Sequence, residues 1–334
     1  MSETAKPPAL NDLVDYLRAF YYGLEVRILQ NPKLSFTAWK DEQPRAKASA
    51  RKPQSTQAAR VPTAIGLSTS TECTRIRTRT VKNSIFSGQL NLNDILDVAI
   101  EILPKDAYAL LMLVDHDIYE DDEDDFVCGR AYGGSKIAVV LMAKYNPIID
   151  ENQGVEREHA WPASHCRAYI EQMRLADQEY PSKEVSVDDP KGGESQDEEE
   201  VSPLRAAVTA HFALPRLSPT SSRYTAALTD LWPSRVCRMA SHELGHCFGI
   251  DHYIYYACVM QGTASLAENV RQPPYACPVD SAKILKATRL ELHEYYKGLL
   301  MFCEKHEDVH MFKAFAAWLR ARLDIIGKSY FVDV

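Results

Sequence analysis

The stretch HELGHCFGIDH, at residues 242–252, is the most informative part of this sequence. His242 and His246 are four residues apart, so on an α-helix their side chains lie on one face, one turn apart. Two imidazoles at this spacing can bind the same Zn²⁺ ion. Glu243 stands beside the first histidine, where its carboxylate can reach a water molecule on the metal. The stretch therefore predicts a helix that carries two zinc ligands and an acid–base group.

Gly249 and His252 extend the motif beyond this helix. Gly249 comes three residues after His246, where a helix can end in a left-handed cap that glycine adopts at low cost. The chain can then turn back and bring in His252 as the third ligand. Three protein nitrogens leave one position for water, which is the open arrangement of a catalytic zinc site. We therefore predict one catalytic zinc ion held by the three histidines, with Glu243 as the general base.

Met260 follows the third histidine after eight residues, in the segment CVMQG at 258–262. A methionine soon after that histidine marks the metzincin Met-turn, in which the thioether packs beneath the zinc ligands. The sequence resembles one metzincin branch, the archaemetzincins, which continue after the third histidine with Cys-x4-Cys-x-Met and later a CPxC pair. The matching segments here are residues 253–260 and the CPVD of 277–280.

The resemblance extends upstream, through LPKDA, FVCGRA and NDIL. It covers about residues 12–40, 88–146 and 224–300. It implies a zinc metallopeptidase with an α/β, metzincin-like fold. That fold has a twisted, mostly parallel sheet with an antiparallel edge strand, a zinc-binding active-site helix and a helical C-terminal part.

Two positions depart from the family pattern. Archaemetzincins bind a second, structural zinc with four cysteines, whereas this chain has Tyr253 and Asp280 at two of those positions and keeps Cys258 and Cys277. Tyrosine is a very unusual zinc ligand and aspartate an occasional one. We expect no tightly bound second zinc, and two thiols that lie close together and stay reduced.

Composition narrows the class of protein. The chain has 334 residues, 46% of them hydrophobic, and a net charge of −8. This negative charge disfavours a nucleic-acid partner, because contacts to phosphates need a basic surface. No apolar stretch of about 18 residues could span a membrane, and no secretory leader is recognisable. The eight scattered cysteines fit a reducing compartment, so we expect an intracellular, cytoplasmic protein. The basic cluster within residues 45–52 leaves the nucleus as an alternative.

Periodicity and turn residues predict the course of the chain. We predict a helix at residues 10–20, capped by Asn11, and a helix that ends near residue 103 and is capped by Asn91 or Asn93. A zinc helix is predicted from about Pro233 to Phe248, and two further helices are predicted at 281–300 and 308–323. Predicted strands are 25–29, 107–114, 126–131 and 137–142. The six carboxylates of 120–125 predict a solvated loop, or alternatively a rim that attracts basic peptides.

Five parts of the chain are expected. They are an N-terminal helix and strand at 1–40, a mobile linker at 41–62, a sheet-bearing half at 63–146, an insertion at 147–223 with a disordered acidic segment at about 183–200, and the zinc helix, Met-turn and C-terminal helices at 224–334.

Two functional hypotheses follow. In the first, the chain hydrolyses peptide or protein substrates, which bind as an added strand near residues 126–132. In the second, it is a zinc-binding protein of metzincin fold that acts as a non-hydrolytic interaction module. Glu243 favours the first, because a purely structural zinc site does not require that carboxylate.

Overall fold

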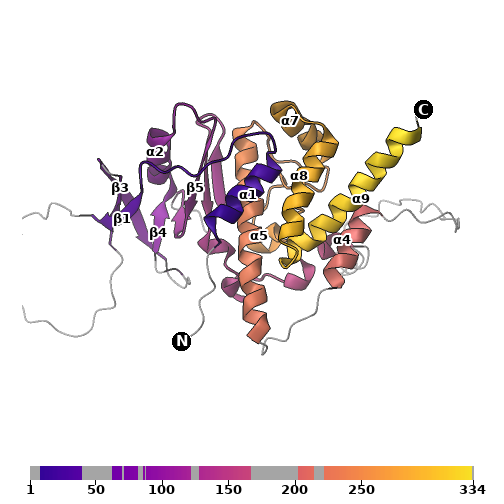
Figure 1. The fold of residues 1–334 in the computed structure, drawn as a ribbon. Helices are drawn as coiled ribbons and strands as arrows, with labels where there is room; N and C mark the ends of the chain where they lie inside the picture. The colour runs from indigo at the N-terminus through magenta and orange to yellow at the C-terminus, as the bar shows by residue number, and fades with distance from the viewer. Residues whose placement is uncertain are drawn as a thin grey trace, which may run out of the picture. The chain divides into compact units, whose positions relative to one another are not determined.

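The structure is a computed structural model that describes residues 8–39, 62–69, 71–81, 86, 88–121, 128–166, 202–213 and 222–332. These residues form mixed α/β structure (Figure 1), as predicted. The chain forms two compact units, which we call the helical unit and the sheet unit. The helical unit comprises Met1–Val26, Asn146–Ser241 and Ile250–Val334, and the sheet unit comprises Arg27–Tyr145 and His242–Gly249. The five parts expected from composition stay a prediction.

The sheet unit contains two β-sheets. The first has the strand order β1-β2-β3-β4-β6, with β1 (Ser35–Ala38), β2 (Ala64–Ser68), β3 (Cys73–Thr80), β4 (Gly88–Asn91) and β6 (Asp117–Tyr119). The second has the order β5-β8-β7, with β5 (Leu110–Val114), β8 (Ile137–Leu141) and β7 (Gly129–Tyr132).

The strand directions differ from the expected arrangement. Among the described strands, β4 with β6 and β5 with β8 pair in parallel, while the other four pairs are antiparallel. The mostly parallel sheet is therefore not confirmed. Short connections join β2, β3 and β4, and parallel neighbours would need long crossovers instead. The expected antiparallel strand is present, because β7 runs antiparallel to β8 at the end of the second sheet.

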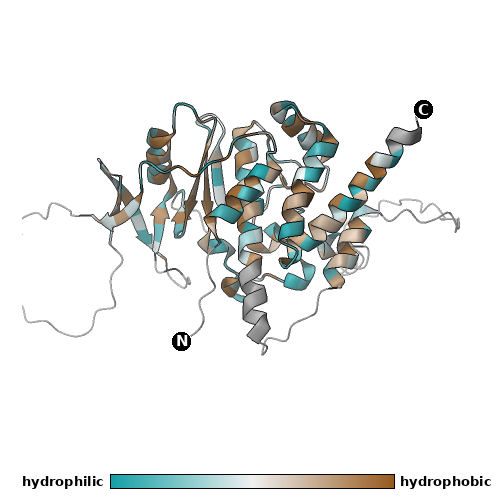
Figure 2. Cartoon of the chain, in the orientation of Figure 1, coloured by the Kyte–Doolittle hydropathy of each residue, from teal (hydrophilic) through white to brown (hydrophobic). Residues whose placement is uncertain are grey.

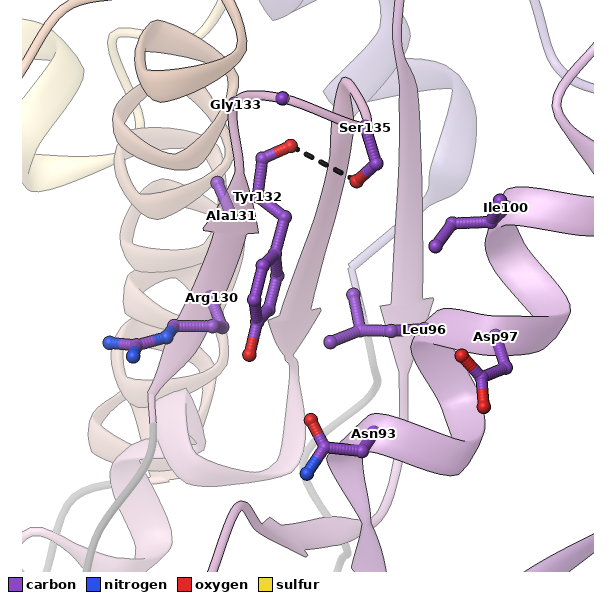
Figure 3. A pocket seen from close by; sticks show the side chains of 10 residues that line it. Asn93, Leu96, Asp97, Ile100, Arg130, Ala131, Tyr132, Gly133 and Ser135 are labelled. Atoms are coloured by element: carbon purple, nitrogen blue, oxygen red, sulfur yellow. Dashed lines mark hydrogen bonds between the residues drawn. The ribbon is translucent and has the colours of Figure 1, made fainter.

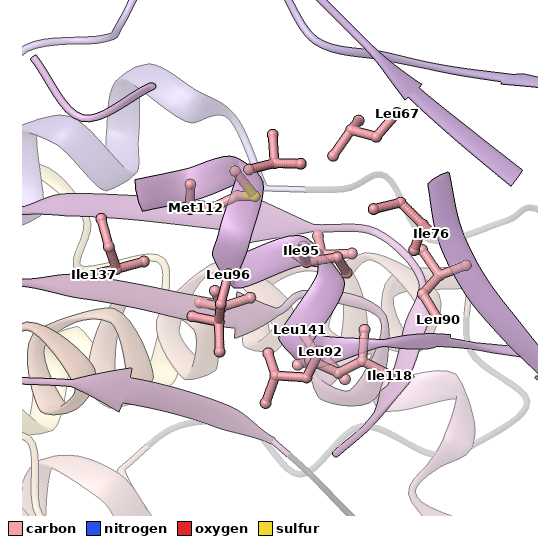
Figure 4. Packing of buried hydrophobic residues seen from close by; sticks show 14 residues of the cluster. Leu67, Ile76, Leu90, Leu92, Ile95, Leu96, Met112, Ile118, Ile137 and Leu141 are labelled. Carbon is pink, nitrogen blue, oxygen red and sulfur yellow. The ribbon is translucent and has the colours of Figure 1, made fainter. Parts of the chain in front are cut away.

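Helix α2 (Leu92–Ile102) packs on the core of the sheet unit. Figure 4 shows Leu92, Ile95 and Leu96 of this helix among apolar side chains of the strands. Asn91 caps the helix by accepting a hydrogen bond from the Asp94 N–H at 3.1 Å, which confirms one of the two predicted caps. Burial of each large aliphatic side chain stabilises the fold by about 1.5–3 kcal/mol.

Strand β8 lies in the middle of the second sheet. All five of its side chains, in the run IAVVL, are fully buried. A continuous apolar run is typical of a strand that is covered on both faces. This strand confirms the prediction made for residues 137–142.

The helical unit is built from helices and short 3₁₀ turns. Its helices are α1 (Leu10–Phe20), α4 (Pro203–Phe212), α5 (Ser222–Cys247), α6 (Leu266–Asn269), α7 (Pro278–Thr288), α8 (Leu292–Lys305) and α9 (His310–Val332), the last six residues of α5 belonging to the sheet unit. Turns η2 to η5 lie between Pro147 and His165, and η1 (Ala143–Tyr145) ends the first segment of the sheet unit. Helices α1 and α8 have both hydrophilic and hydrophobic residues around their axes (Figure 2), as helices with one buried face do.

Two predictions about where helices begin are wrong. Helix α1 covers the predicted residues, but its N-cap is Ala9 rather than Asn11. Helix α5 begins at Ser222, so Pro233 lies inside it and not in its first turn. Trp232, Val236 and Met239 are buried, and this packing outweighs the hydrogen bond that proline removes.

The predicted helix at 281–300 is two helices. Helix α7 ends at Thr288, and Arg289 adopts the left-handed conformation with a φ of 58°. The N–H of Leu290 donates to the carbonyl of Leu285, which closes the end of α7 before α8 begins. The apolar periodicity continues across this break, so it does not reveal it.

The predicted strand at 25–29 is also wrong. These residues form neither helix nor strand, and the Val26 carbonyl accepts a hydrogen bond from the Arg18 side chain at 3.0 Å. Strands need a partner, and alternation alone does not supply one.

Some predictions fall on residues outside those described. These are the linker up to residue 61, the basic cluster within 45–52, the acidic run beyond Asp121, the strand residues 126–127 and the acidic segment at 183–200. Among the residues that the structure does describe, no helix has the length and apolar character needed to cross a membrane.

Candidate metal centre

The three predicted histidine ligands converge. Their ligand nitrogens, from His242, His246 and His252, all lie within 4.8 Å of one another. On helix α5 the Nε2 atoms of His242 and His246 are 3.2 Å apart, and the two rings are nearly perpendicular, at 87°. His242 is buried, His246 half-buried and His252 exposed.

The separation of these nitrogens fits a shared metal ion. Zinc–nitrogen bonds of about 2.0–2.1 Å in tetrahedral geometry place neighbouring ligand nitrogens roughly 3.3–3.4 Å apart. The observed 3.2 Å is close to that value. Neutral imidazoles are also the ligands that zinc prefers among nitrogen donors. The donor set therefore fits Zn²⁺.

A left-handed glycine ends the zinc helix, as predicted. Helix α5 ends at Cys247, and Gly249 has a φ of 75°. The Gly249 N–H donates to the carbonyl of His246 at 3.0 Å, which stabilises the turn. Through this turn the chain reverses and reaches His252.

Glu243 is buried at the second position of the motif. Only 5% of its surface is exposed, and burial raises the pKa of its carboxyl to about 8, with a smaller opposing effect from Arg130. A nearby cation favours the ionised form of such a group. Metal binding would therefore prepare Glu243 to accept a proton.

The segment after His252 forms a hydrogen-bonded loop in which Met260 is buried. Met260 is 2% exposed, and its carbonyl accepts a hydrogen bond from the Tyr253 N–H at 3.0 Å. The Val259 N–H donates to the Tyr275 carbonyl at 2.7 Å. These bonds fix the base of the loop that carries the third ligand.

A second cluster joins Cys258, Cys277 and Asp280, all of which are buried. Their ligand atoms lie within 4.8 Å of one another, and both thiols are free. The Cys258 and Cys277 thiols lie 3.3 and 3.5 Å from the same Asp280 oxygen. Lys283 forms an ion pair with the other Asp280 oxygen at 3.2 Å. Hydrogen bonds and one cation thus already satisfy this carboxylate.

Tyr253, which stands at the first of the four positions where archaemetzincins have cysteine, contacts other aromatic rings. It stacks on Tyr256 with centroids 5.7 Å apart and meets Tyr255 at 5.8 Å.

Strand β7 and helix α2 border a groove in the sheet unit. Figure 3 shows Tyr132 on one side of it and Leu96 and Ile100 on the other. Arg130 forms an ion pair with Glu120 at 3.3 Å, and the Tyr132 hydroxyl donates to the same carboxylate. Ile100 is 49% exposed here. The three histidines and Glu243 do not line this groove, but residues 130–132 of the predicted substrate-binding segment do.

The remaining histidines stand apart from the metal centre. His159 contacts Glu156 and His165 contacts Ser164. His310 is half-buried, and its ring stacks on that of His211 with centroids 4.5 Å apart.

Two glycines of the β7–β8 hairpin touch the zinc helix, and the motifs did not reveal them. A β-carbon at Gly129 would lie 2.5 Å from Glu243 Oε1, and one at Gly133 would lie 2.9 Å from the His246 carbonyl oxygen. In the helical unit, a β-carbon at Gly262 would lie 3.1 Å from His252 Nδ1. For Gly129 the sequence offered one signal, because a glycine inside a strand often marks a site where another part of the chain approaches closely.

Comparison with known proteins confirms the resemblance to archaemetzincins. No family model matches the chain. Human archaemetzincin-2 is 21% identical over 95% of this chain and 69% of its own length, and archaemetzincin-2 of Rattus norvegicus is 24% identical over 87% and 57%. Archaemetzincin-1 of Mus musculus is 25% identical over 63% of the chain and 33% of its own length. The chain thus spans between a third and about two thirds of these relatives, and a divergent member of the family is consistent with this similarity.

Two solved structures are also similar. The crystal structure of archaemetzincin from Methanopyrus kandleri has a TM-score of 0.32 and 18% identity, covering 60% of this chain and 67% of that one. A zinc-dependent peptidase from Methanocorpusculum labreanum has a TM-score of 0.31 and 18% identity, covering 59% and 74%.

Proposed function

We propose that this chain is a zinc-dependent metallopeptidase of archaemetzincin type that hydrolyses peptide bonds in peptides or proteins. The observation that carries the proposal is the convergence of three imidazoles beside a buried carboxylate, at 242–252. The curated relatives support it, because they are archaemetzincins.

His242, His246 and His252 would hold the ion, leaving one position open. When bound there, zinc polarises a carbonyl group and lowers the pKa of water toward about 7. Because His242 and His246 come from one helix, their relative positions are set by the backbone hydrogen bonds of α5. His252 depends instead on the turn at Gly249.

Glu243 would act as the general base. It would accept a proton from the attacking water and return it to the leaving amine. Its burial suits this role, because a carboxylate in a poorly solvated site is a stronger base than one in water. Arg130, whose charge acts on Glu243, would limit this increase in basicity.

The substrate would bind as an extended strand along β7. Within the described residues β7 pairs with β8 on one side, and its second edge has no partner strand. Gly129 brings this strand directly against Glu243. An added strand would therefore pass close to the proposed base.

The test combines metal analysis with a peptide-library cleavage assay on parent protein and Glu243→Gln. We expect both proteins to hold zinc and Glu243→Gln to lose hydrolysis, because metal binding and proton transfer belong to different side chains. Glu294→Gln, on the exposed side of α8, is the matched control and should cleave as the parent does. Undiminished turnover in Glu243→Gln would contradict the mechanism. A zinc-loaded parent that cleaves no peptide would favour the non-hydrolytic interaction module.

A further inference from the structure

Strand β7 passes Glu243 at a distance that leaves no room for a side chain. A β-carbon on Gly129 would lie 2.5 Å from Oε1 and 2.9 Å from both Cδ and Cγ of Glu243. Contacts below 3.0 Å are essentially never made by real β-carbons. The Glu243 carboxylate can therefore take its observed position only because residue 129 is glycine.

The backbone of β7 is held in place from its other side. Gly129 pairs with Val140 of β8, whose side chain is fully buried. The Leu141 N–H donates to the Cys128 carbonyl at 3.1 Å, one residue before the contact with Glu243. Strand β7 thus cannot withdraw from Glu243 without breaking its pairing with the central strand. A side chain added at position 129 must be accommodated by movement of Glu243.

The end of the same hairpin adds a second constraint. A β-carbon on Gly133 would lie 2.9 Å from the carbonyl oxygen of His246. That atom belongs to the helix backbone, which gives way less easily than the end of a side chain. The hairpin therefore meets helix α5 at two points, beside Glu243 and beside His246.

We propose that Gly129 is a positioning residue for Glu243. The backbone of β7 at this residue limits the positions that the Glu243 carboxylate can take. This inference rests on the proposed function, in which Glu243 is the proton acceptor. Gly129 itself contacts neither zinc nor the reacting atoms, and it acts through the position of Glu243.

The size of the expected effect follows from the contact. In Gly129→Ala the Oε1 atom must move from 2.5 Å to about 3.4 Å, where ordinary contacts begin, which is a shift of about 0.9 Å. Misplacement of a catalytic group by about 1 Å can reduce the rate on the order of 100-fold. The zinc ligands keep their positions, so zinc binding should not change.

The experiment compares Gly129→Ala with two matched glycine variants of the sheet unit. Gly134→Ala lies in the same hairpin, where a β-carbon meets nothing within 4 Å. Gly66→Ala introduces a similar clash away from the metal centre, at 2.6 Å from Thr37 Oγ1 and Cys73 Sγ. For each protein, kcat, KM, zinc content and Tm are measured.

We expect Gly129→Ala to lose about 100-fold in kcat, with KM and zinc content near those of the parent. Gly134→Ala should match the parent, and Gly66→Ala should lower Tm while leaving kcat unchanged. In Gly129→Ala the further change Glu243→Asp, which shortens the side chain, should cost less activity than it does in the parent, because the two positions are coupled.

A second readout does not depend on turnover. The side-chain carboxyl ¹³C resonance of Glu243, assigned by its loss in Glu243→Gln, should shift in zinc-free Gly129→Ala and stay in place in both glycine controls. If the parent cleaves no peptide, the proposed function fails, and this resonance still tests the positioning role.

Three results would overturn the inference. The first is an unmoved Glu243 resonance in Gly129→Ala. The second is a rise in KM at constant kcat, which would make β7 a substrate-binding strand alone. The third is an equal loss of kcat in Gly129→Ala and Gly66→Ala, which would reduce the effect to general destabilisation.

Discussion

Gly249→Ala should separate the cost of a strained backbone from the loss of a contact. Gly249 has a φ of +75°, and a β-carbon there would meet nothing within 4 Å. Alanine at this position adds conformational strain without a clash. For a residue other than glycine, the left-handed conformation costs roughly 1–2 kcal/mol.

This strain should appear in zinc affinity. The turn at Gly249 must stay left-handed for His252 to join the two helix ligands, whereas without metal the turn can relax. A cost of about 1–2 kcal/mol corresponds to a roughly 5- to 30-fold weaker affinity for zinc. Gly249→Asn should lose less, because asparagine tolerates this conformation better than alanine.

Gly154 provides the matched control. It has a φ of +61°, follows the 3₁₀ turn η3 (Glu151–Gln153) and also has open space around its β-position. Gly154→Ala should lower the free energy of unfolding by about 1–2 kcal/mol and leave zinc affinity unchanged. Zinc affinity is measured by competition with a chelator, and stability by denaturant unfolding of the zinc-free protein. Equal zinc affinities for Gly249→Ala and Gly154→Ala would refute the reasoning.

Two further predictions concern a buried ion pair of the helical unit and the number of zinc ions that the chain binds. Asp150→Asn should destabilise the protein by about 3–5 kcal/mol, because the buried Arg235 loses the carboxylate to which it donates at 2.6 and 2.8 Å. Denaturant unfolding checks this value, and a loss as small as that of Asp15→Asn, in an exposed ion pair, would contradict it. Elemental analysis should find one tightly held zinc per chain, which is lost when His242 and His246 are replaced. Two tightly held zincs, of which one disappears in Cys258→Ser, would show that the Cys258 cluster binds metal after all.

The sequence alone predicted the three histidines that converge in the candidate metal centre. The spacing of His242 and His246 places them on one helix face, and Gly249 supplies the reversal that His252 needs. These are local relations within eleven residues, so backbone geometry is enough to predict them. The cap at Asn91 and the buried strand β8 were predictable for the same reason.

Predictions that required a distant partner were less successful. The alternation at 25–29 produces no strand in the described structure, and helix α5 extends past Pro233 because buried side chains support it. The break at Arg289 interrupts a pattern that remained helical in period. In each case tertiary packing decides an outcome that local propensity leaves open.

Only the tertiary structure placed Gly129 against Glu243. Hydrophobic period and motif spacing encode which face of a helix or strand is buried, and which side chains share that face. They do not encode which other element covers the face, because that depends on how segments distant along the chain pack together. The three predicted metal ligands therefore lie in one short stretch of sequence, whereas strand β7 of the sheet unit reaches Glu243 only in the folded chain.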